Sequence, residues 1–225
     1  MIHNMSRPLR VLIACEESQE ECLAFRYVGH EAFSCDLQQC SGGHPEWHVV
    51  GDCLDLFENP DSFITQDGKQ HDASIGWDLI ISHPPCTYIT KAGSNWLFDG
   101  QHRIKDYERW AMLLEAREFF MKCYAAPARY VAVENPMPMK VARLPQRSCV
   151  VQPYEFGEPW SKCTWLWLRN LPPLIPTIWM ESYKSWVHCT RGSKKRSKSF
   201  RGIARAMAIQ WSAFIIEDMT RNHLL

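Results

Sequence analysis

Short apolar runs alternate with longer amphipathic stretches along most of the chain, and this alternation restricts the fold more than any other feature. Residues 10–14 and 77–82 are almost wholly apolar over strand length, which is typical of strands buried on both faces. Further strands are expected at residues 31–35, 47–50, 130–134 and 165–168. Helices are expected at residues 18–27, 109–124 and 203–214. Strands that alternate with helices in this way predict an α/β fold with a mostly parallel, doubly wound sheet.

The segment 109–124 is the strongest predicted helix, because its apolar residues recur at helical spacing. The residues expected to face the core are Trp110, Leu113, Leu114, Phe120, Met121 and Tyr124. Residues 99–105 and 171–201 show no such period. We therefore expect one domain over residues 1–225, with 171–201 as an irregular basic loop or small subdomain rich in Pro, Lys, Arg and Ser.

Composition narrows the class of protein. Hydrophobic residues make up 46% and charged residues 22%, which argues against wholesale disorder. The formal net charge is zero, so any nucleic-acid binding has to come from local clusters. The first ten residues contain no apolar run of the signal-peptide kind, and no apolar stretch is long enough to span a bilayer. We therefore expect a cytoplasmic protein without a membrane partner. Its ten cysteines are expected to be free core thiols, metal ligands or nucleophiles rather than disulfides.

A cysteine follows the predicted strand 77–82 after two prolines, in the segment His83-Pro84-Pro85-Cys86. Ligands of open α/β sheets bind beyond the carboxyl ends of strands. The prolines restrict the backbone and hold the thiol in one place, as a nucleophile requires. A strand-ending turn with a buried thiol is the alternative interpretation.

The predicted strand 130–134 ends in Glu134-Asn135-Pro136. A carboxyl group at the same sheet edge as Cys86 can act as an acid or a hydrogen-bond donor if burial raises its pKa. The alternative is a solvated strand end.

Together these two motifs resemble those of the cytosine-C5 DNA methyltransferases. Pro84-Pro85-Cys86 is similar to the Pro-Cys nucleophile motif of that family, and Glu134-Asn135-Pro136 is similar to its Glu-Asn-Val motif. Looser matches follow in the same order, and they comprise residues 11–18, Asp36, Gly51-Asp52, residues 156–164 and residues 200–208. The resemblance covers nearly the whole chain. It implies a Rossmann-like fold dependent on S-adenosylmethionine, with DNA as the partner.

The resemblance also implies roles for single residues. The catalytic group would be Cys86, Glu134 and Asn135. Cofactor contacts would come from Ala14, Cys15, Glu16, Glu17, Ser18, Asp36, Leu37, Asp52, Cys53 and Pro84. Substrate contacts would come from Pro85, Lys162, Thr164, Lys194, Lys195, Arg196 and Lys198. Because the thiolate is the nucleophile, the surroundings of Cys86 are expected to lower its pKa.

The chain departs from the family in three places. Its cofactor loop, Cys15-Glu16-Glu17-Ser18, contains no glycine. Lys162 and Thr164 stand where the family has arginines. Only about thirty residues separate Leu171 from Arg201, which is too few for a target-recognition domain. These departures favour single-stranded or non-specific DNA as the substrate, as in small phage-encoded members of the family. They also leave two alternatives open, a non-catalytic module that binds DNA or a partner and a methylase of free pyrimidine nucleotides.

Four further features were weighed for binding. Six cations in residues 191–201 can neutralise phosphates, or can form a solvated loop. Trp96 and Trp160 are candidate stacking partners for a base. Residues 90–103 can form a mobile loop over the substrate. Cys35, Cys40, His44 and His48 lie close together in sequence but lack the usual zinc spacing, so we expect no metal.

Overall fold

The computed structural model describes residues 7–58, 61–190, 192 and 198–223. Its centre is a seven-stranded sheet in the order β3-β2-β1-β6-β7-β10-β8. The strands are β1 (Arg10–Ala14), β2 (Glu31–Asp36), β3 (His48–Val50), β6 (Leu79–Ser82), β7 (Tyr130–Pro136), β8 (Cys149–Val151) and β10 (Thr164–Arg169). The first five in sheet order are parallel, whereas β10 runs antiparallel to both β7 and β8.

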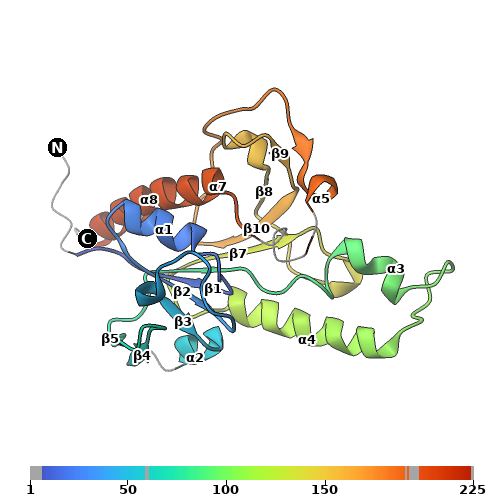
Figure 1. The fold of residues 1–225 in the computed structure, drawn as a ribbon, viewed down its shortest axis with the longest axis horizontal. Coiled ribbons are helices and arrows are strands. Elements are labelled where there is room, and N and C mark those ends of the chain that lie inside the picture. The colour runs from blue at the N-terminus through green and yellow to red at the C-terminus, as the bar shows by residue number, and fades with distance from the viewer. Residues whose placement is uncertain (1–6, 59–60, 191, 193–197, 224–225) are drawn as a thin grey trace.

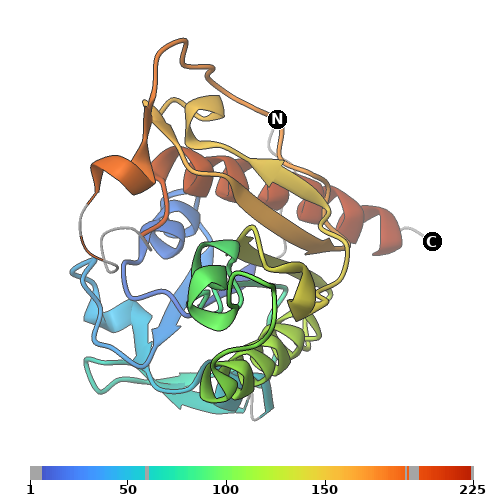
Figure 2. The ribbon, with the colours of Figure 1, turned by 90° about the vertical axis from the view of Figure 1, so that its right-hand side faces the viewer.

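Helices cover both faces of this sheet (Figure 1). On one face lie α1 (Glu20–Tyr27), α7 (Arg201–Ala206), the π-helical turn η5 (Met207–Trp211) and α8 (Ser212–His223). On the other lie α2 (Cys53–Glu58) and α4 (Tyr107–Tyr124). The end-on view of Figure 2 shows the two helix layers with the sheet between them. The chain thus buries two separate cores, one on each side of the sheet.

Strand β1 shows why the sheet is covered on both faces. Leu12 and Ala14 belong to the core beneath α4, while Val11 and Ile13 belong to the core beneath α1 and α8. Alternate side chains of a strand point to opposite faces, so an unbroken apolar run has to be buried twice.

Short helical turns and two pairs of short strands complete the fold. The short helical turns are η1 (Pro45–Trp47), η2 (Lys91–Gly93), α3 (Ser94–Leu97), η3 (Lys140–Ala142), η4 (Pro153–Glu155) and α5 (Trp186–Cys189). The short strands are β4 (Ser62–Ile64) with β5 (Gln70–Asp72), and β9 (Trp160–Ser161) with β11 (Lys184–Ser185). Segment 171–201 therefore contributes β11 and α5, and β11 ties it to β9. Within the described residues, no helix has both the length and the apolarity needed to cross a bilayer.

The predicted α/β class and mostly parallel sheet are confirmed, but several details differ. Helix α1 begins at Glu20 rather than residue 18, because Gln19 adopts a left-handed backbone with φ of 61°. Leu114 was wrongly placed in the core and is 47% exposed. Strand β7 continues through Asn135 to Pro136, because its neighbour β10 pairs with it over that length. Strand β8 was not predicted.

The loop after Cys86 is also more ordered than expected. Residues 90–103 include η2 and α3, and the side chain of Leu97 is fully buried. The backbone N–H of Lys91 donates to the carbonyl of Met137 at 2.9 Å. These contacts anchor the segment against the chain that follows β7, and its closure over a substrate stays a prediction.

Gly202 sets the approach of α7 to η4. A Cβ atom at this position would lie 2.0 Å from the carbonyl oxygen of Phe156, which no side chain can tolerate. The Gly202 N–H donates to Glu158 Oε1 at 3.0 Å. Only glycine allows this contact, and it brings Phe200 and Arg201 close to the segment that leads into β10.

Candidate active site

The carboxyl ends of β6 and β7 bring the two sequence motifs together. Ser82 pairs with Val133 at the end of the parallel ladder. Beyond it, Asn135 Nδ2 donates to the carbonyl of Pro84 at 3.0 Å. This buried contact ties the segment that carries Cys86 to the segment that carries Glu134.

A second link joins the same two strand ends. His83 Nδ1 lies 3.2 Å from Glu134 Oε2, within hydrogen-bond distance. On its other side, His83 Nε2 lies 3.4 Å from Glu21 Oε1 of helix α1. The imidazole is therefore flanked by two carboxylates in a site that is largely closed to solvent. Sequence analysis did not single out His83, and only its position directly before the two prolines could have drawn attention to it.

His83 and Glu134 shift each other's pKa values. Burial by itself would lower the pKa of His83, but Glu21 and the bond to Glu134 outweigh it, so the pKa is raised above its ordinary value. Burial by itself would raise the pKa of Glu134, but the bond to His83 and the charge of Lys162 outweigh it, so this pKa is lowered. The site therefore favours a protonated His83 beside an ionised Glu134.

Two acceptor atoms next to this pair are unsatisfied. Glu134 Oε1 and Asn135 Oδ1 are buried, and neither has a hydrogen-bond partner among the described residues. An unpaired buried acceptor costs about 1–3 kcal/mol, so such atoms call for a donor from a ligand. Adjacent side chains of a strand point to opposite faces, so one ligand group meets only one of these acceptors. Glu134 Oε1, on the carboxylate that contacts His83, is the one suited to a group with N–H donors.

Cys86 does not have the acidity expected of it. The side chain is half-buried. Burial and the negative charge of Glu134 raise the pKa of the Cys86 thiol, and Lys162 only partly opposes them. The expectation of a lowered pKa is therefore wrong for the protein without a ligand. A thiol in this setting has to lose its proton as it reacts.

The residues of the candidate cofactor loop are mostly turned inward. Ala14 is fully buried in the sheet, and Glu16, Glu17 and Ser18 are each at most 9% exposed. Glu16 Oε1 accepts a hydrogen bond from the backbone N–H of Glu21 at 2.7 Å. Glu16 thus satisfies the amino end of α1 and is not available to a ligand. Burial and repulsion by Glu21 raise the pKa of Glu16 well above its ordinary value.

Other cofactor candidates lie at the ends of neighbouring strands. Asp36 is the last residue of β2, Asp52 lies two residues after β3, and the Gly51 N–H donates to the carbonyl of Asp36 at 3.0 Å. Each carboxylate accepts one local backbone N–H and retains further acceptor capacity. Leu37 is 77% exposed beside Asp36. This edge of the sheet therefore offers carboxylates and an apolar surface to a ligand.

Two more of the cofactor candidates belong to a group of thiols. Cys15 Sγ lies 3.9 Å from Cys53 Sγ, and Cys123 of α4 adjoins them in the core. Hydrogen bonds from Cys123 and Cys15 lower the pKa of Cys53 to about 5. Cys15 adopts a left-handed backbone with φ of 61°, a conformation more often given to glycine.

Only some of the candidate substrate residues lie near Cys86 and Glu134. Thr164 of β10 is buried and pairs with Pro136, so it lies beside the Glu134 strand end, whereas Pro85 is exposed. Lys162 acts electrostatically on Cys86, Glu134 and His83. Lys198 donates to Ser41 Oγ at 3.2 Å. The remaining candidates, Lys194, Lys195 and Arg196, lie outside the described residues.

Two of the four residues weighed as zinc ligands, His48 and Cys35, bond to protein groups. His48 bonds Ser34 Oγ through one ring nitrogen and the Gln38 carbonyl through the other. Cys35 Sγ donates to the Gly51 carbonyl. In the described part of the chain, no three His, Cys, Asp or Glu residues are grouped as a metal site.

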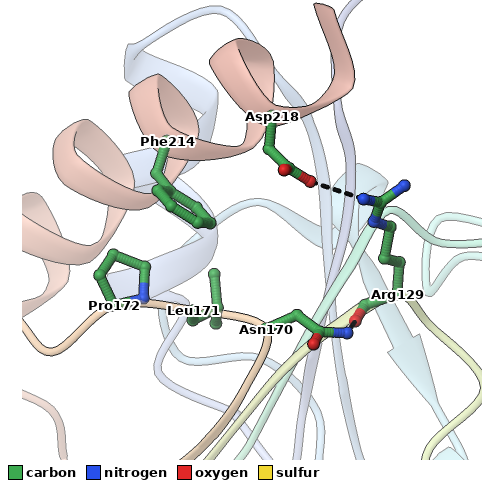
Figure 3. Close-up of a pocket in the computed structure, with 6 residues that line it drawn as sticks. All are labelled: Arg129, Asn170, Leu171, Pro172, Phe214 and Asp218. Atoms are coloured by element: carbon green, nitrogen blue, oxygen red, sulfur yellow. Dashed lines mark hydrogen bonds and ion pairs between the residues drawn. The ribbon is translucent and has the colours of Figure 1, made fainter. Parts of the chain in front are cut away.

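Two hollows of the described part of the chain lie away from Cys86. One, of about 430 Å³, is lined by Arg129, Asn170, Leu171, Pro172, Phe214 and Asp218 (Figure 3). Arg129 and Asp218 form an ion pair across it at 2.7 Å. It lies at the amino end of β7, whereas Glu134 lies near the other end. The second hollow is lined in part by Trp160, whereas Trp96 is 70% exposed on α3.

Comparisons with known proteins give only distant structural relatives. No family model and no curated protein matches the sequence. One similar structure is described as a DNA modification methyltransferase encoded within an Escherichia coli prophage, with 14% identity over 76% of this chain and a TM-score of 0.44. Another is a mutant of Spodoptera frugiperda DNMT2, with 14% identity over 79% of this chain and a TM-score of 0.39. The chain spans about half the length of each, 52% and 54% respectively.

The His83–Glu134 pair predicts a pH-dependent contribution to stability. Because the folded-state pKa of His83 is raised, its contribution is complete below its ordinary pKa of 6.5 and is lost as the pH rises through the folded-state value. Because the folded-state pKa of Glu134 is lowered, its contribution is complete above 4.5 and is lost as the pH falls through the folded-state value.

We therefore expect the difference in unfolding free energy between the wild type and His83→Gln to be largest between these two ordinary values. Urea unfolding over a pH series measures it. A difference that stays constant with pH would show that His83 and Glu134 do not interact as charges.

Proposed function

We propose that this chain is an S-adenosylmethionine-dependent methyltransferase that acts on C5 of cytosine in DNA, with Cys86 as its nucleophile. The observation that carries the proposal is the unsatisfied buried acceptor Glu134 Oε1, on a strand end that Asn135 ties to the Cys86 segment. Cytosine presents an exocyclic amine with N–H donors, as this atom requires.

The residues can share the steps of such a reaction. The Cys86 sulfur forms a bond to C6 of the ring, which makes C5 nucleophilic. One proton leaves the sulfur and one is gained at ring N3, so the addition is neutral overall. Glu134, ionised beside His83, can accept the proton that leaves the sulfur and pass it to N3. Once C5 carries the methyl group, its own proton is lost to solvent, the bond between Cys86 and C6 breaks, and the proton held at N3 returns to the sulfur.

The reaction also needs a methyl donor. S-adenosylmethionine supplies an electrophilic methyl group when bound. Asp36 and Asp52 would accept hydrogen bonds from its polar groups, and Leu37 would cover an apolar part. The fit is incomplete at the loop, where Glu16 satisfies helix α1 instead of facing a ligand.

A base within a duplex cannot reach a thiol at the edge of a sheet. The target nucleotide has to be flipped out or already unpaired. The short segment between Leu171 and Arg201 offers little surface for reading a long duplex sequence. We therefore propose single-stranded DNA, bound with little sequence selectivity, as the substrate.

The test is to identify the product directly. The protein is incubated with S-adenosylmethionine and single-stranded DNA, the DNA is digested, and the nucleosides are analysed by mass spectrometry. We expect 5-methyldeoxycytidine. A methyl group on another atom or base would refute the proposed chemistry, and free deoxycytidine monophosphate as a better substrate would favour the nucleotide methylase.

One observation favours a second function, a module that binds nucleic acid without catalysis. Glu16 occupies the amino end of α1, in the loop where the resemblance places the cofactor. Calorimetry with S-adenosylmethionine separates the two functions. Complete absence of binding, together with retained DNA binding, would establish the non-catalytic module.

A further inference from the structure

The second hollow, of about 250 Å³, is lined by aromatic rings and by side chains of both charges. It lies where the amino ends of α1 and α7 meet the segment that contains β9 and α5. We call it the aromatic pocket and define it by Trp160, Trp186, Phe200, Lys198 and Arg201. No step proposed for Cys86 uses these residues.

The walls are set at steep angles to one another. The rings of Trp160 and Trp186 have centroids 5.0 Å apart at 70°, and those of Trp186 and Phe200 have centroids 5.2 Å apart at 69°. A flat ring that stacks on one wall therefore directs its edge at another. This geometry suits a planar aromatic ligand better than a flexible chain.

One wall also has an unsatisfied donor. Trp186 Nε1 is buried and has no hydrogen-bond partner among the described residues. Buried indole N–H groups normally find an acceptor. Ring nitrogens and carbonyl oxygens of nucleobases are acceptors of the required kind.

The charged residues that line the pocket are two acidic ones, Glu20 and Glu158, and two basic ones, Lys198 and Arg201. Glu20 Oε2 already accepts from Arg201 Nε at 3.2 Å, and Glu158 Oε1 accepts from the Gly202 N–H. The Arg201 side chain is nevertheless 84% exposed and retains further N–H donors. With Lys198 beside it, the mouth can hold a phosphate.

The pocket adjoins the candidate active site through one short stretch of chain. Trp160 precedes Lys162 by two residues, and Thr164 pairs with Pro136, two residues after Glu134. Lys162 Nζ lies 5.8 Å from the centroid of the Phe200 ring. A strand that delivers one base to Glu134 can therefore place a neighbouring base in the aromatic pocket.

We propose that the aromatic pocket binds the base of a nucleotide next to the target in an unpaired strand, while Lys198 and Arg201 contact its phosphates. The proposal rests on the proposed function only in naming the target, since binding itself requires no methyl transfer. It assigns strand recognition to stacking, which tolerates any base.

The test uses fluorescence anisotropy with labelled oligothymidylate, which contains no cytosine. We expect Trp160→Ala to weaken binding about tenfold, as the loss of one base stack does. Trp186→Phe retains the ring and removes the N–H, and we expect it to weaken binding a few-fold. Trp179→Ala is the matched control, because Trp179 is exposed outside the pocket, and its binding should not change.

Each outcome decides the proposal. Equal affinities for the wild type, Trp186→Phe and Trp160→Ala would overturn it, as would equally tight binding of a thymine–adenine duplex. If thermal unfolding shows that Trp160→Ala is misfolded, Trp186→Phe alone decides. Oligouridylate in parallel separates DNA from RNA as the source of the strand. If the pocket variants bind oligothymidylate as the wild type does and the protein still methylates cytosine, the proposed function stands and the role of the aromatic pocket is refuted.

Discussion

Replacing Cys86 by alanine is expected to reduce methyl transfer to single-stranded DNA at least about a thousandfold, because removal of a covalent nucleophile leaves only positioning by the rest of the site. Labelled methyl from S-adenosylmethionine, counted on the DNA, measures the loss. Cys86 is half-buried in a loop whose position is set by the prolines and by Asn135, so the fold should be retained. We expect unfolding free energy to change by no more than about 1 kcal/mol.

Cys189→Ala is the matched control, because Cys189 is an exposed thiol of α5. Its activity should equal that of the wild type. If Cys86→Ala retains activity while its melting temperature is unchanged, the covalent mechanism is wrong and the site transfers methyl groups in another way.

Glu134→Gln is expected to lower kcat about a thousandfold, within the range that a positioned acid–base group contributes. The amide keeps the shape of the side chain, but it can neither carry a proton nor pair with a charged His83. The same change should make Cys86 more acidic, because the Glu134 charge is one cause of the raised pKa of that thiol. Iodoacetamide should therefore alkylate Cys86 faster in the variant at neutral pH.

In Glu134→Gln, methyl transfer should become slower while alkylation of Cys86 becomes faster. These opposite changes distinguish a role in proton transfer from simple damage to the site. A misfolded site would change both rates, but it would not combine slower methyl transfer with faster alkylation of Cys86 in this way. Glu118→Gln, on the exposed face of α4, is the control, and both of its rates should match the wild type. Unchanged methyl transfer in Glu134→Gln would remove this carboxylate from the proposed chemistry.

Strands were the part of the fold that sequence predicted best. β1 agrees with its predicted range, and β2, β3, β6 and β10 agree within two residues at each end. A strand with an unbroken apolar run has apolar side chains on both faces, so both faces have to be buried. The short edge strand β8 was missed, because its pairing with β10 is set by a partner later in the chain.

The candidate site was predictable only in part. Strand-end motifs placed Cys86 and Glu134 on one edge, since parallel strands end together. The contact of His83 with Glu21 could not be predicted, because it depends on how α1 packs against the end of β6. The raised pKa of Cys86 also depends on tertiary packing, because the burial of the thiol and the nearby charge of Glu134 exist only in the folded chain.

By itself, the sequence determined the alternation of strand and helix and the rigid Pro-Pro-Cys turn, because these depend on residues adjacent along the backbone. Only the tertiary structure decided which charges flank His83 and Glu134, which acceptors remain unsatisfied, and that Trp160, Trp186 and Phe200 enclose a pocket. These features join segments far apart in the chain, and their energies depend on distance and burial, which arise only when those segments pack together.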